Sequence, residues 1–219
     1  MKNETPGKWT DWCHVGKEEI EHYKETAEKI FMPVYKILAR EVIDEFGIKK
    51  GTGIDIGSGT GGFACEIAKI SELKLFALDT KKEMIEIMKE KIEKEGLVDR
   101  VIPEYGNAHD LPFDDNSVDL IVSRGSFQFW SDKRMVISEI FRVLKLGGFG
   151  FVGGGFGKNK EIRERAMKLH KKTYKKINNG RSFAENLKMK YQEYREILKE
   201  FTNYKINFDK SGLWIIVRK

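Results

Sequence analysis

The chain has 219 residues, of which 40% are hydrophobic and 34% are charged, which excludes a disordered protein and suffices for one full hydrophobic core. Its two cysteines, Cys13 and Cys65, exclude a disulfide framework and a four-cysteine metal site, and we expect no metal. Residues 157–200 contain fourteen basic and six acidic residues, a net charge of +8, so this segment accounts for the whole excess in the chain's net charge of +6. No apolar run is long enough to span a membrane and residues 1–12 lack the apolar core of a signal peptide, so we expect a cytoplasmic protein without membrane contact.

Hydrophobic periodicity predicts helices and strands along the whole chain. Residues 16–46 read as two amphipathic helices, with Pro33 at the start of the second and Gly47 at its end. Strands and helices then alternate, and Gly147 and Gly148 are expected to end the helix before the fifth strand. The predicted strands are 52–56, 73–78, 101–105, 118–123, 149–153, 204–208 and 213–217, and the predicted helices are 61–70, 81–95, 132–145 and two in the basic segment, broken at 178–180.

This alternation predicts an α/β fold: a doubly wound, mostly parallel seven-stranded sheet with helices on both faces. The last two strands are too close in sequence for a crossover connection, so we expect a C-terminal antiparallel hairpin. We divide the single domain into an N-terminal helical cap or lid (1–50), a cofactor-binding core (51–156), a basic helical insert (157–203) and a closing β-hairpin (204–219).

The most informative stretch is G-I-D-I-G-S-G-T-G-G at 53–62, where a strand ends in a carboxylate, the backbone turns on glycines and a helix follows. This geometry brings backbone N–H groups close to an adenosine-containing ligand. A second acid, Asp79, closes the next strand and can accept hydrogen bonds from ribose hydroxyls. Together the two acids indicate a nucleoside cofactor.

Asp55 decides which cofactor the turn favours. A carboxylate at this position would repel the pyrophosphate of a dinucleotide, whereas S-adenosyl-L-methionine (SAM) has no phosphate and carries an ammonium and a sulfonium. The sequence therefore favours SAM over NAD. A turn that binds no ligand, with Asp55 capping the helix or bonding a loop amide, is the structural alternative.

Four motifs in order resemble the class I SAM-dependent methyltransferases: D-I-G-S-G-T-G at 55–61, L-D-T at 78–80, G-N-A-H-D-L-P-F at 106–113, and the strand 119–123 followed by Arg124. The resemblance covers roughly residues 51–154 and the terminal hairpin. Within the family, the chain looks most like the branch that methylates small molecules. It implies the Rossmann-like fold, SAM as the methyl donor and methyl transfer as the activity.

The resemblance also implies a set of cofactor-binding residues. They are Asp55, Gly57, Ser58, Gly59, Gly61, Asp79, Thr80, Met84, Asn107, Ala108, Ser123 and Arg124. Asp55 would pair with the ammonium group, Asp79 would bind the ribose, and Met84 would border the adenine or simply pack in the core. Asn107 stands where the family usually has Asp, and its amide oxygen can still accept from the adenine amino group. Separately, Tyr23 on the first helix is expected to reach the SAM carboxylate.

Methyl transfer from a sulfonium is an in-line displacement, so the protein can act mainly by aligning the reactants and excluding water. The sequence therefore identifies no catalytic residue. Side chains that could act as bases are His14, His22, Tyr23, Tyr35 and His109. Trp9, Trp12 and His14 precede the first helix, where they form a lid over the acceptor or anchor the N-terminus on the core.

We expect a methyltransferase that acts on an unidentified small molecule. The strand end at 123–126 lacks the N/D-P-P-Y/F motif of enzymes that methylate adenine, cytosine or glutamine amino groups. Two alternatives stay open: an RNA methyltransferase that uses the basic insert, where Tyr174, Tyr191 and Tyr194 lie among lysines, or a SAM-binding protein without catalysis. The acceptor atom and the oligomeric state are not predicted.

Overall fold

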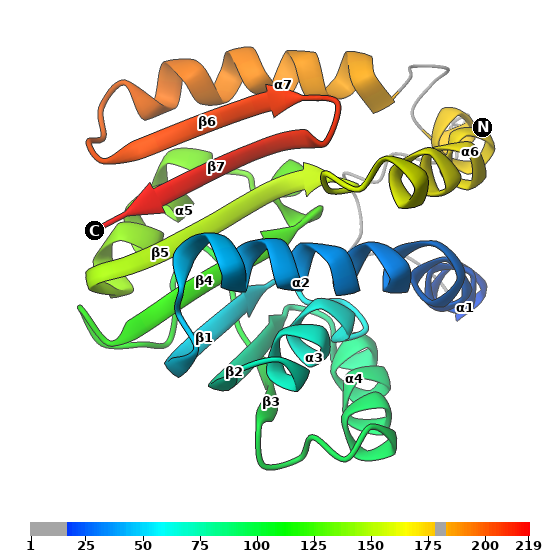
Figure 1. Cartoon of the computed structure of the whole chain (residues 1–219), viewed down its shortest axis with the longest axis horizontal. Helices are drawn as coiled ribbons and strands as arrows, with labels where there is room; N and C mark the ends of the chain where they lie inside the picture. The colour runs from blue at the N-terminus through cyan, green and yellow to red at the C-terminus, as the bar shows by residue number, and fades with distance from the viewer. Residues whose placement is uncertain (1–16, 178–182) are drawn as a thin grey trace, which may run out of the picture.

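The computed structural model describes residues 17–177 and 183–219, and the strands in these residues form one seven-stranded sheet in the order β3-β2-β1-β4-β5-β7-β6 (Figure 1). Strands β1 to β5 are parallel to one another, and β7 runs antiparallel to both β5 and β6. The strands are β1 (Lys50–Ile56), β2 (Glu72–Asp79), β3 (Val101–Tyr105), β4 (Val118–Arg124), β5 (Leu144–Gly155), β6 (Tyr204–Asp209) and β7 (Gly212–Arg218). The expected fold class, with its closing antiparallel hairpin, is confirmed.

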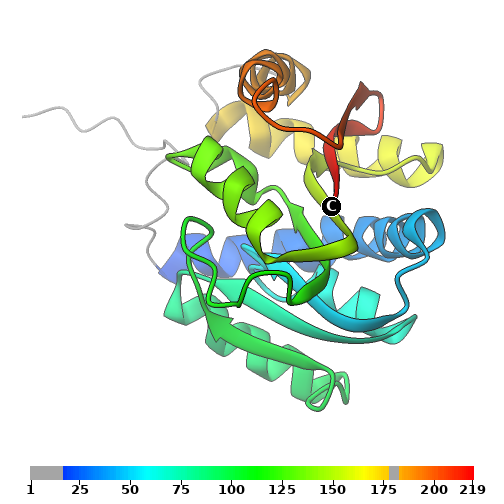
Figure 2. The same cartoon turned by 90° about the vertical axis from the view of Figure 1, so that its left-hand side faces the viewer.

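Helices cover both faces of the sheet, as Figures 1 and 2 show. They are α1 (Lys17–Thr26), η2 (Ala27–Phe31), α2 (Met32–Phe46), α3 (Gly62–Lys69), α4 (Lys82–Lys94), η3 (Ser126–Gln128), α5 (Lys133–Val143), α6 (Lys160–Ile177) and α7 (Phe183–Leu198). Apolar side chains of α2, α3, α4 and α6 form one core layer with one face of the sheet. Those of α5 and α7 form the second layer on the other face. Within the described residues, no helix has the length and apolar character needed to cross a membrane.

The second N-terminal helix, α2, begins beside Pro33 as predicted. The chain does not break before it but passes through η2, a π-helical turn in which the Met32 N–H donates to the Ala27 carbonyl, five residues back. Proline has no N–H to donate and its ring crowds the carbonyl four residues earlier, so a regular turn is unfavourable at this point. Gly47 ends α2 with a left-handed φ of 69°, as expected.

The boundary between α5 and β5 differs from the prediction. The helix ends at Val143 rather than at residue 145, and β5 already begins at Leu144. Leu144 pairs with Val118 of β4, and the Ser117 N–H donates to the Val143 carbonyl, so sheet pairing takes these residues from the helix. Gly147 therefore lies inside the long strand and does not end the helix.

Candidate cofactor site

The strand order creates a switch point between β1 and β4, where the chain leaves the sheet in opposite directions and where α/β proteins bind ligands. At this point the glycine turn joins β1 to α3. Gly57, Gly59 and Gly61 have φ values of 67°, 57° and 76°, a region that L-residues with side chains rarely adopt. The Ser58 N–H donates to the Leu78 carbonyl at 2.8 Å, which holds the turn against the end of β2.

Two of these glycines are also packed too closely against neighbouring side chains to carry a Cβ atom. A Cβ atom on Gly59 would lie 2.6 Å from the Tyr23 hydroxyl, and one on Gly57 would overlap the Ser126 side chain. The turn is thus packed directly against Tyr23 of α1 and Ser126 of η3, and only glycine fits at these two positions. The absence of side chains in such a turn is also what lets a ligand approach the main chain closely.

Asp55 lies beneath the turn with 1% of its surface exposed. It accepts a hydrogen bond from the Ser58 hydroxyl at 2.6 Å. Burial raises its pKa to about 7, and hydrogen bonds from Ser58 and the Ala64 backbone offset only part of this shift. The bond to the Ala64 amide in the first turn of α3 is the helix-capping contact of the structural alternative for Asp55. A nearby cation would favour the charged form of this carboxyl.

Asp79 links the ends of β1 and β2. One of its carboxylate oxygens accepts from the Gly59 N–H at 2.9 Å and the other from the Lys81 N–H at 3.0 Å. Burial raises its pKa, while these backbone hydrogen bonds oppose the shift. A carboxylate can accept about four hydrogen bonds, so Asp79 retains acceptor capacity for hydroxyl groups. Thr80, next in the chain, is exposed, and Met84 is fully buried, as its core-packing alternative requires.

Two tyrosines from the N-terminal helices lie over the turn. The Tyr35 ring stacks on Phe63 with 5.7 Å between ring centroids, and its hydroxyl is hydrogen-bonded to Tyr23. Burial is the main cause that raises the pKa of both tyrosines, and that of Tyr23 is raised well above its ordinary value. Both hydroxyls therefore keep their protons, which suits hydrogen-bond donors better than catalytic bases.

The 106–113 loop is held by His109. The Asn107 side-chain oxygen accepts from the His109 N–H at 3.0 Å and lies 2.8 Å from the His109 Nδ1. The His109 Nε2 accepts from the Asp132 N–H at 3.1 Å, which makes Nδ1 the protonated nitrogen of a neutral ring. The oxygen expected to receive the adenine amino group is thus already engaged within the loop, and His109 ties the loop to the start of α5. Ala108, in the same loop, is buried.

The end of β4 contributes two different environments. Ser123 is fully buried and bonds the Ser126 hydroxyl, which in turn donates to the Ile56 carbonyl at 3.0 Å. Ser123 therefore supports the turn from behind. Arg124 is only partly buried, and its guanidinium lies 4.2 Å from the ring centroid of Phe31.

The Arg124 guanidinium also lies 5.5 Å from the Tyr35 ring and 5.4 Å from the Phe156 ring. Its Nε donates to the Gly155 carbonyl at 2.9 Å. The sequence did not predict this enclosure by aromatic rings. Phe31 and Tyr35 lie on the N-terminal helices and Phe156 follows β5, and no spacing pattern connects them with residue 124.

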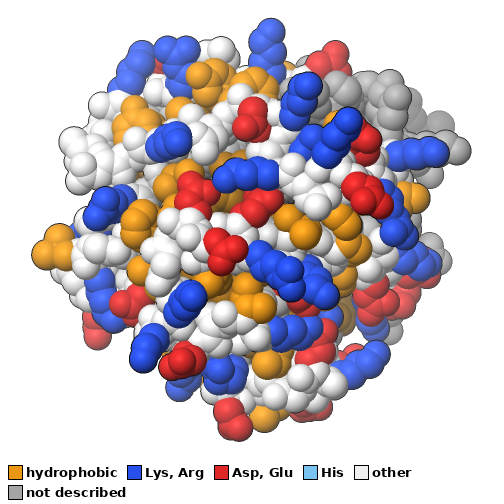
Figure 3. All heavy atoms as spheres, in the orientation of Figure 1, with side chains coloured by type: hydrophobic (Ala, Val, Ile, Leu, Met, Phe, Trp, Pro, Cys, Tyr) orange, Lys and Arg blue, Asp and Glu red, His pale blue; other side chains and the backbone are white. Residues whose placement is uncertain are grey.

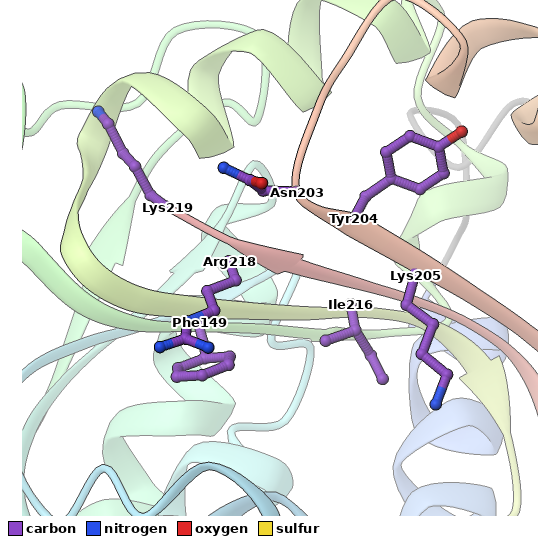
Figure 4. A pocket seen from close by; sticks show the side chains of 7 residues that line it. All are labelled: Phe149, Asn203, Tyr204, Lys205, Ile216, Arg218 and Lys219. Carbon is purple, nitrogen blue, oxygen red and sulfur yellow. The ribbon is translucent and has the colours of Figure 1, made fainter.

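Other predicted features lie elsewhere. Trp9, Trp12 and His14 lie outside the described residues, as does the side chain of His22. A surface cavity of about 460 Å³ lies on the terminal hairpin, away from the glycine turn, and contains none of the predicted site residues (Figure 4). It is lined by Phe149, Asn203, Tyr204, Lys205, Ile216, Arg218 and Lys219. In the described part of the chain, no three His, Cys, Asp or Glu side chains are grouped as metal ligands.

Comparison with known proteins identifies a methyltransferase domain in residues 54–152. A crystal structure of a putative S-adenosyl-L-methionine-dependent methyltransferase from Methanococcus maripaludis is 36% identical, covers 100% of this chain and 97% of its own, and has a TM-score of 0.85. Structures at lower identity share the fold alone: a SAM-dependent methyltransferase from Aquifex aeolicus is 19% identical, with a TM-score of 0.61. It covers 93% of this chain and 99% of its own.

Among proteins of assigned function, the chain is similar to ubiquinone/menaquinone biosynthesis C-methyltransferases UbiE. The protein from Haemophilus ducreyi is 30% identical over 118 residues, which are 52% of this chain and 46% of the relative. The protein from Psychromonas ingrahamii is 32% identical over 120 residues, which are 53% of this chain and 48% of the relative. The chain thus matches about half the length of these relatives.

Proposed function

Because the chain belongs to the family of S-adenosyl-L-methionine-dependent methyltransferases, we propose that it transfers the methyl group of SAM to a small-molecule acceptor at the carboxyl ends of β1, β2 and β4. The comparisons confirm the family that the four sequence motifs predict. The small-molecule acceptor is supported by the likeness to the UbiE C-methyltransferases, which extends over about half their length. For the same reason, a carbon atom is the first acceptor atom to test.

The single observation that carries the proposal is the pair of buried carboxylates around the glycine turn. In this proposal Asp79 binds the ribose hydroxyls with the acceptor capacity that its two backbone hydrogen bonds leave free. Asp55 is too deeply buried for direct contact, so it acts on the ammonium group through Ser58 and through its charge. The main chain at Gly59 lies against the methionine half, and the Tyr23 hydroxyl above it donates to the SAM carboxylate.

Further residues of the predicted set complete this proposed site. Gly57 and Gly61 shape the turn, Thr80 and the Ala108 amide border the adenine, and Ser123 supports the turn through Ser126. Asn107 contributes to the adenine edge by shaping its loop, since its side-chain oxygen is bound to His109.

SAM brings a methyl group already activated by its sulfonium, so the chain itself need not supply a strong base or nucleophile. The described side chains over the turn include no such base or nucleophile. Tyr23 and Tyr35 retain their protons, and the rings of Phe31, Tyr35 and Phe156 exclude water from the end of β4. Alignment and exclusion of water are then the main contributions of the protein to the rate.

The helical cap (1–50) and the insert (157–203) are proposed to select the acceptor. Tyr23 of α1, Phe31 of η2 and Tyr35 of α2 reach the site, which supports this role for the cap. For the insert, Ala166 of α6 joins the core layer formed by α2 and α3. A cytoplasmic location, expected from the sequence, belongs to the same proposal.

The RNA methyltransferase alternative gains no support from the described part of the insert. Tyr194 is buried and donates to the Phe127 carbonyl, and Tyr191 stacks on Phe208, so neither is available to stack on bases. Lys190 of α7 and Lys199, the residue directly after this helix, pair with glutamates of α7. Figure 3 shows basic and acidic side chains interspersed on the face that it displays.

Calorimetry with SAM, S-adenosylhomocysteine and NAD tests the cofactor, and release of S-adenosylhomocysteine in the presence of candidate acceptors tests transfer. We expect micromolar dissociation constants for the first two ligands and none measurable for NAD. NAD binding as tight as SAM binding would overturn the assignment. SAM binding without turnover on any metabolite would support the non-catalytic alternative, and binding to RNA with a steep salt dependence would support the RNA alternative.

A further inference from the structure

Arg124 carries a positive charge that no carboxylate of the described residues neutralises. Its Nε–H bonds the neutral Gly155 carbonyl, and the Tyr35 hydroxyl is hydrogen-bonded to the guanidinium. The ion pairs of the described residues do not include Arg124. In contrast, the half-exposed Arg142 is paired with both Glu139 and Asp115.

Keeping an unneutralised guanidinium partly out of water is unfavourable unless other interactions offset the lost hydration. Three aromatic rings, those of Phe31, Tyr35 and Phe156, provide part of this compensation through cation–π contacts. The rings also hold the planar group in place. Of the five N–H donors of the guanidinium, one bonds Gly155 and one bonds Tyr35, which leaves three. A fork of this kind matches the two oxygens of a carboxylate.

The strand order places this charge apart from the two acids. Asp55 and Asp79 belong to β1 and β2, whereas Arg124 ends β4 and bonds the carbonyl at the end of β5. The carboxyl edge of the sheet therefore has a negative half at β1 and β2 and a positive half at β4 and β5. The cationic donor end of SAM suits the negative half, which leaves the positive half for the other reactant.

We propose that Arg124 binds a carboxylate of the methyl acceptor, so that the substrate is an organic acid. This inference rests on the proposed function, because it assigns the β1 and β2 half of the site to SAM. A carboxylate fits better than a phosphate dianion, since a single guanidinium supplies one positive charge and its described ring neighbours supply none. The carboxylate of SAM itself is a second source of the same chemistry, and the test distinguishes the two.

The experiment uses Arg124→Met, which keeps the length of the side chain and removes its charge and donors. Arg134→Met is the matched control, because it removes an exposed arginine that pairs with Glu200, and neither residue belongs to the proposed site. Dissociation constants are measured for SAM and for decarboxylated SAM. The full-length protein loaded with S-adenosylhomocysteine is then screened by thermal shift and calorimetry against aromatic and aliphatic monocarboxylic acids and their carboxamides.

We expect at least one acid to bind the loaded parent protein and its carboxamide to bind at least about ten-fold more weakly, as for loss of a hydrogen bond between charged groups. Arg124→Met should lose this preference while binding SAM as the parent does, and Arg134→Met should retain it. The inference is overturned if no acid binds, if carboxamides bind as well as acids, or if Arg124→Met keeps the preference. It is also overturned if Arg124→Met weakens SAM but not decarboxylated SAM, which would assign the guanidinium to the cofactor. Failure of the parent to bind SAM would instead refute the proposed function.

Discussion

Replacing Asp55 by asparagine is expected to stabilise the cofactor-free protein at mildly alkaline pH while weakening its affinity for SAM. Folding buries the Asp55 carboxyl and raises its pKa from 3.8 to about 7. A raised pKa in the folded state means that the group contributes most to stability below its unfolded pKa, and that this contribution is lost as the pH rises through about 7. Ionised Asp55 thus destabilises the free protein and is favoured again when a cation binds near the turn.

The size of the effect follows from the shift. Each pKa unit corresponds to about 1.4 kcal/mol, so a shift from 3.8 to about 7 opposes folding by about 4 kcal/mol at pH values above 7. Asparagine removes this term but cannot accept as well from both Ser58 and the Ala64 amide, which costs about 1–2 kcal/mol. We therefore expect a net gain of about 2–3 kcal/mol in the free energy of unfolding at pH 8.

Urea unfolding of the parent and of Asp55→Asn, each from about pH 5 to pH 8, measures this directly. Because the two proteins share every other titrating group, the difference between their unfolding free energies isolates Asp55. That difference should shrink by about 3 kcal/mol when the pH falls from 8 to 5. A difference that does not change with pH would refute the argument, as would an asparagine variant less stable than the parent at pH 8. Calorimetry on the same proteins should show about ten-fold weaker SAM binding in the variant.

Three further substitutions test the turn and its neighbours. Asp79→Asn keeps the shape of the side chain but can accept only one of the two backbone hydrogen bonds well. Calorimetry should therefore show SAM binding about 10–100-fold more weakly. Unchanged affinity in a folded variant would remove Asp79 from the site. Gly59→Ala should lose SAM binding because its Cβ would displace Tyr23, whereas Gly96→Ala, at a similar φ with nothing within 4 Å, should lose only thermal stability; equal loss of binding in both would mean that backbone strain alone matters. His109→Ala should weaken SAM binding by releasing the adenine loop from Asp132, and it should leave the melting temperature nearly unchanged; a large drop in melting temperature with normal affinity would make His109 a purely structural residue.

Features that are local in sequence could be predicted well. The glycine turn, the acids that end β1 and β2 and the alternation of strands and helices each lie within short windows, and the structure places these acids around the turn as adjacent parallel strands require. Boundaries set by long-range pairing could not be predicted, because Leu144 is strand only through its partner Val118.

The surroundings of a site residue, such as Arg124, also could not be predicted from the sequence. Position 124 was predicted from its place at the end of a strand, but its surroundings depend on Phe31 and Phe156, which only the fold brings to it. The same applies to Asn107, whose oxygen is taken by His109 two residues later. Residue identity at a motif position indicates where a site lies, whereas hydrogen bonding within the fold decides what each side chain can still do.

The π-helical turn η2, which ends just before Pro33, explains how the N-terminal helices bring three aromatic residues to the same site. In a regular α-helix each residue advances by about 100°, so Phe31 and Tyr35 would stand about 80° and 120° away from Tyr23. A π turn has the effect of inserting about one residue, which sets the later positions back by about 100° and brings all three within about 20° of one face. The contacts agree with this geometry. Tyr23 lies against Gly59, the ring centroids of Phe31 and Tyr35 are 6.2 Å apart, and the Tyr35 hydroxyl is hydrogen-bonded to Tyr23. Periodicity read along the sequence cannot anticipate this phase shift, since it follows from the missing N–H of a single proline.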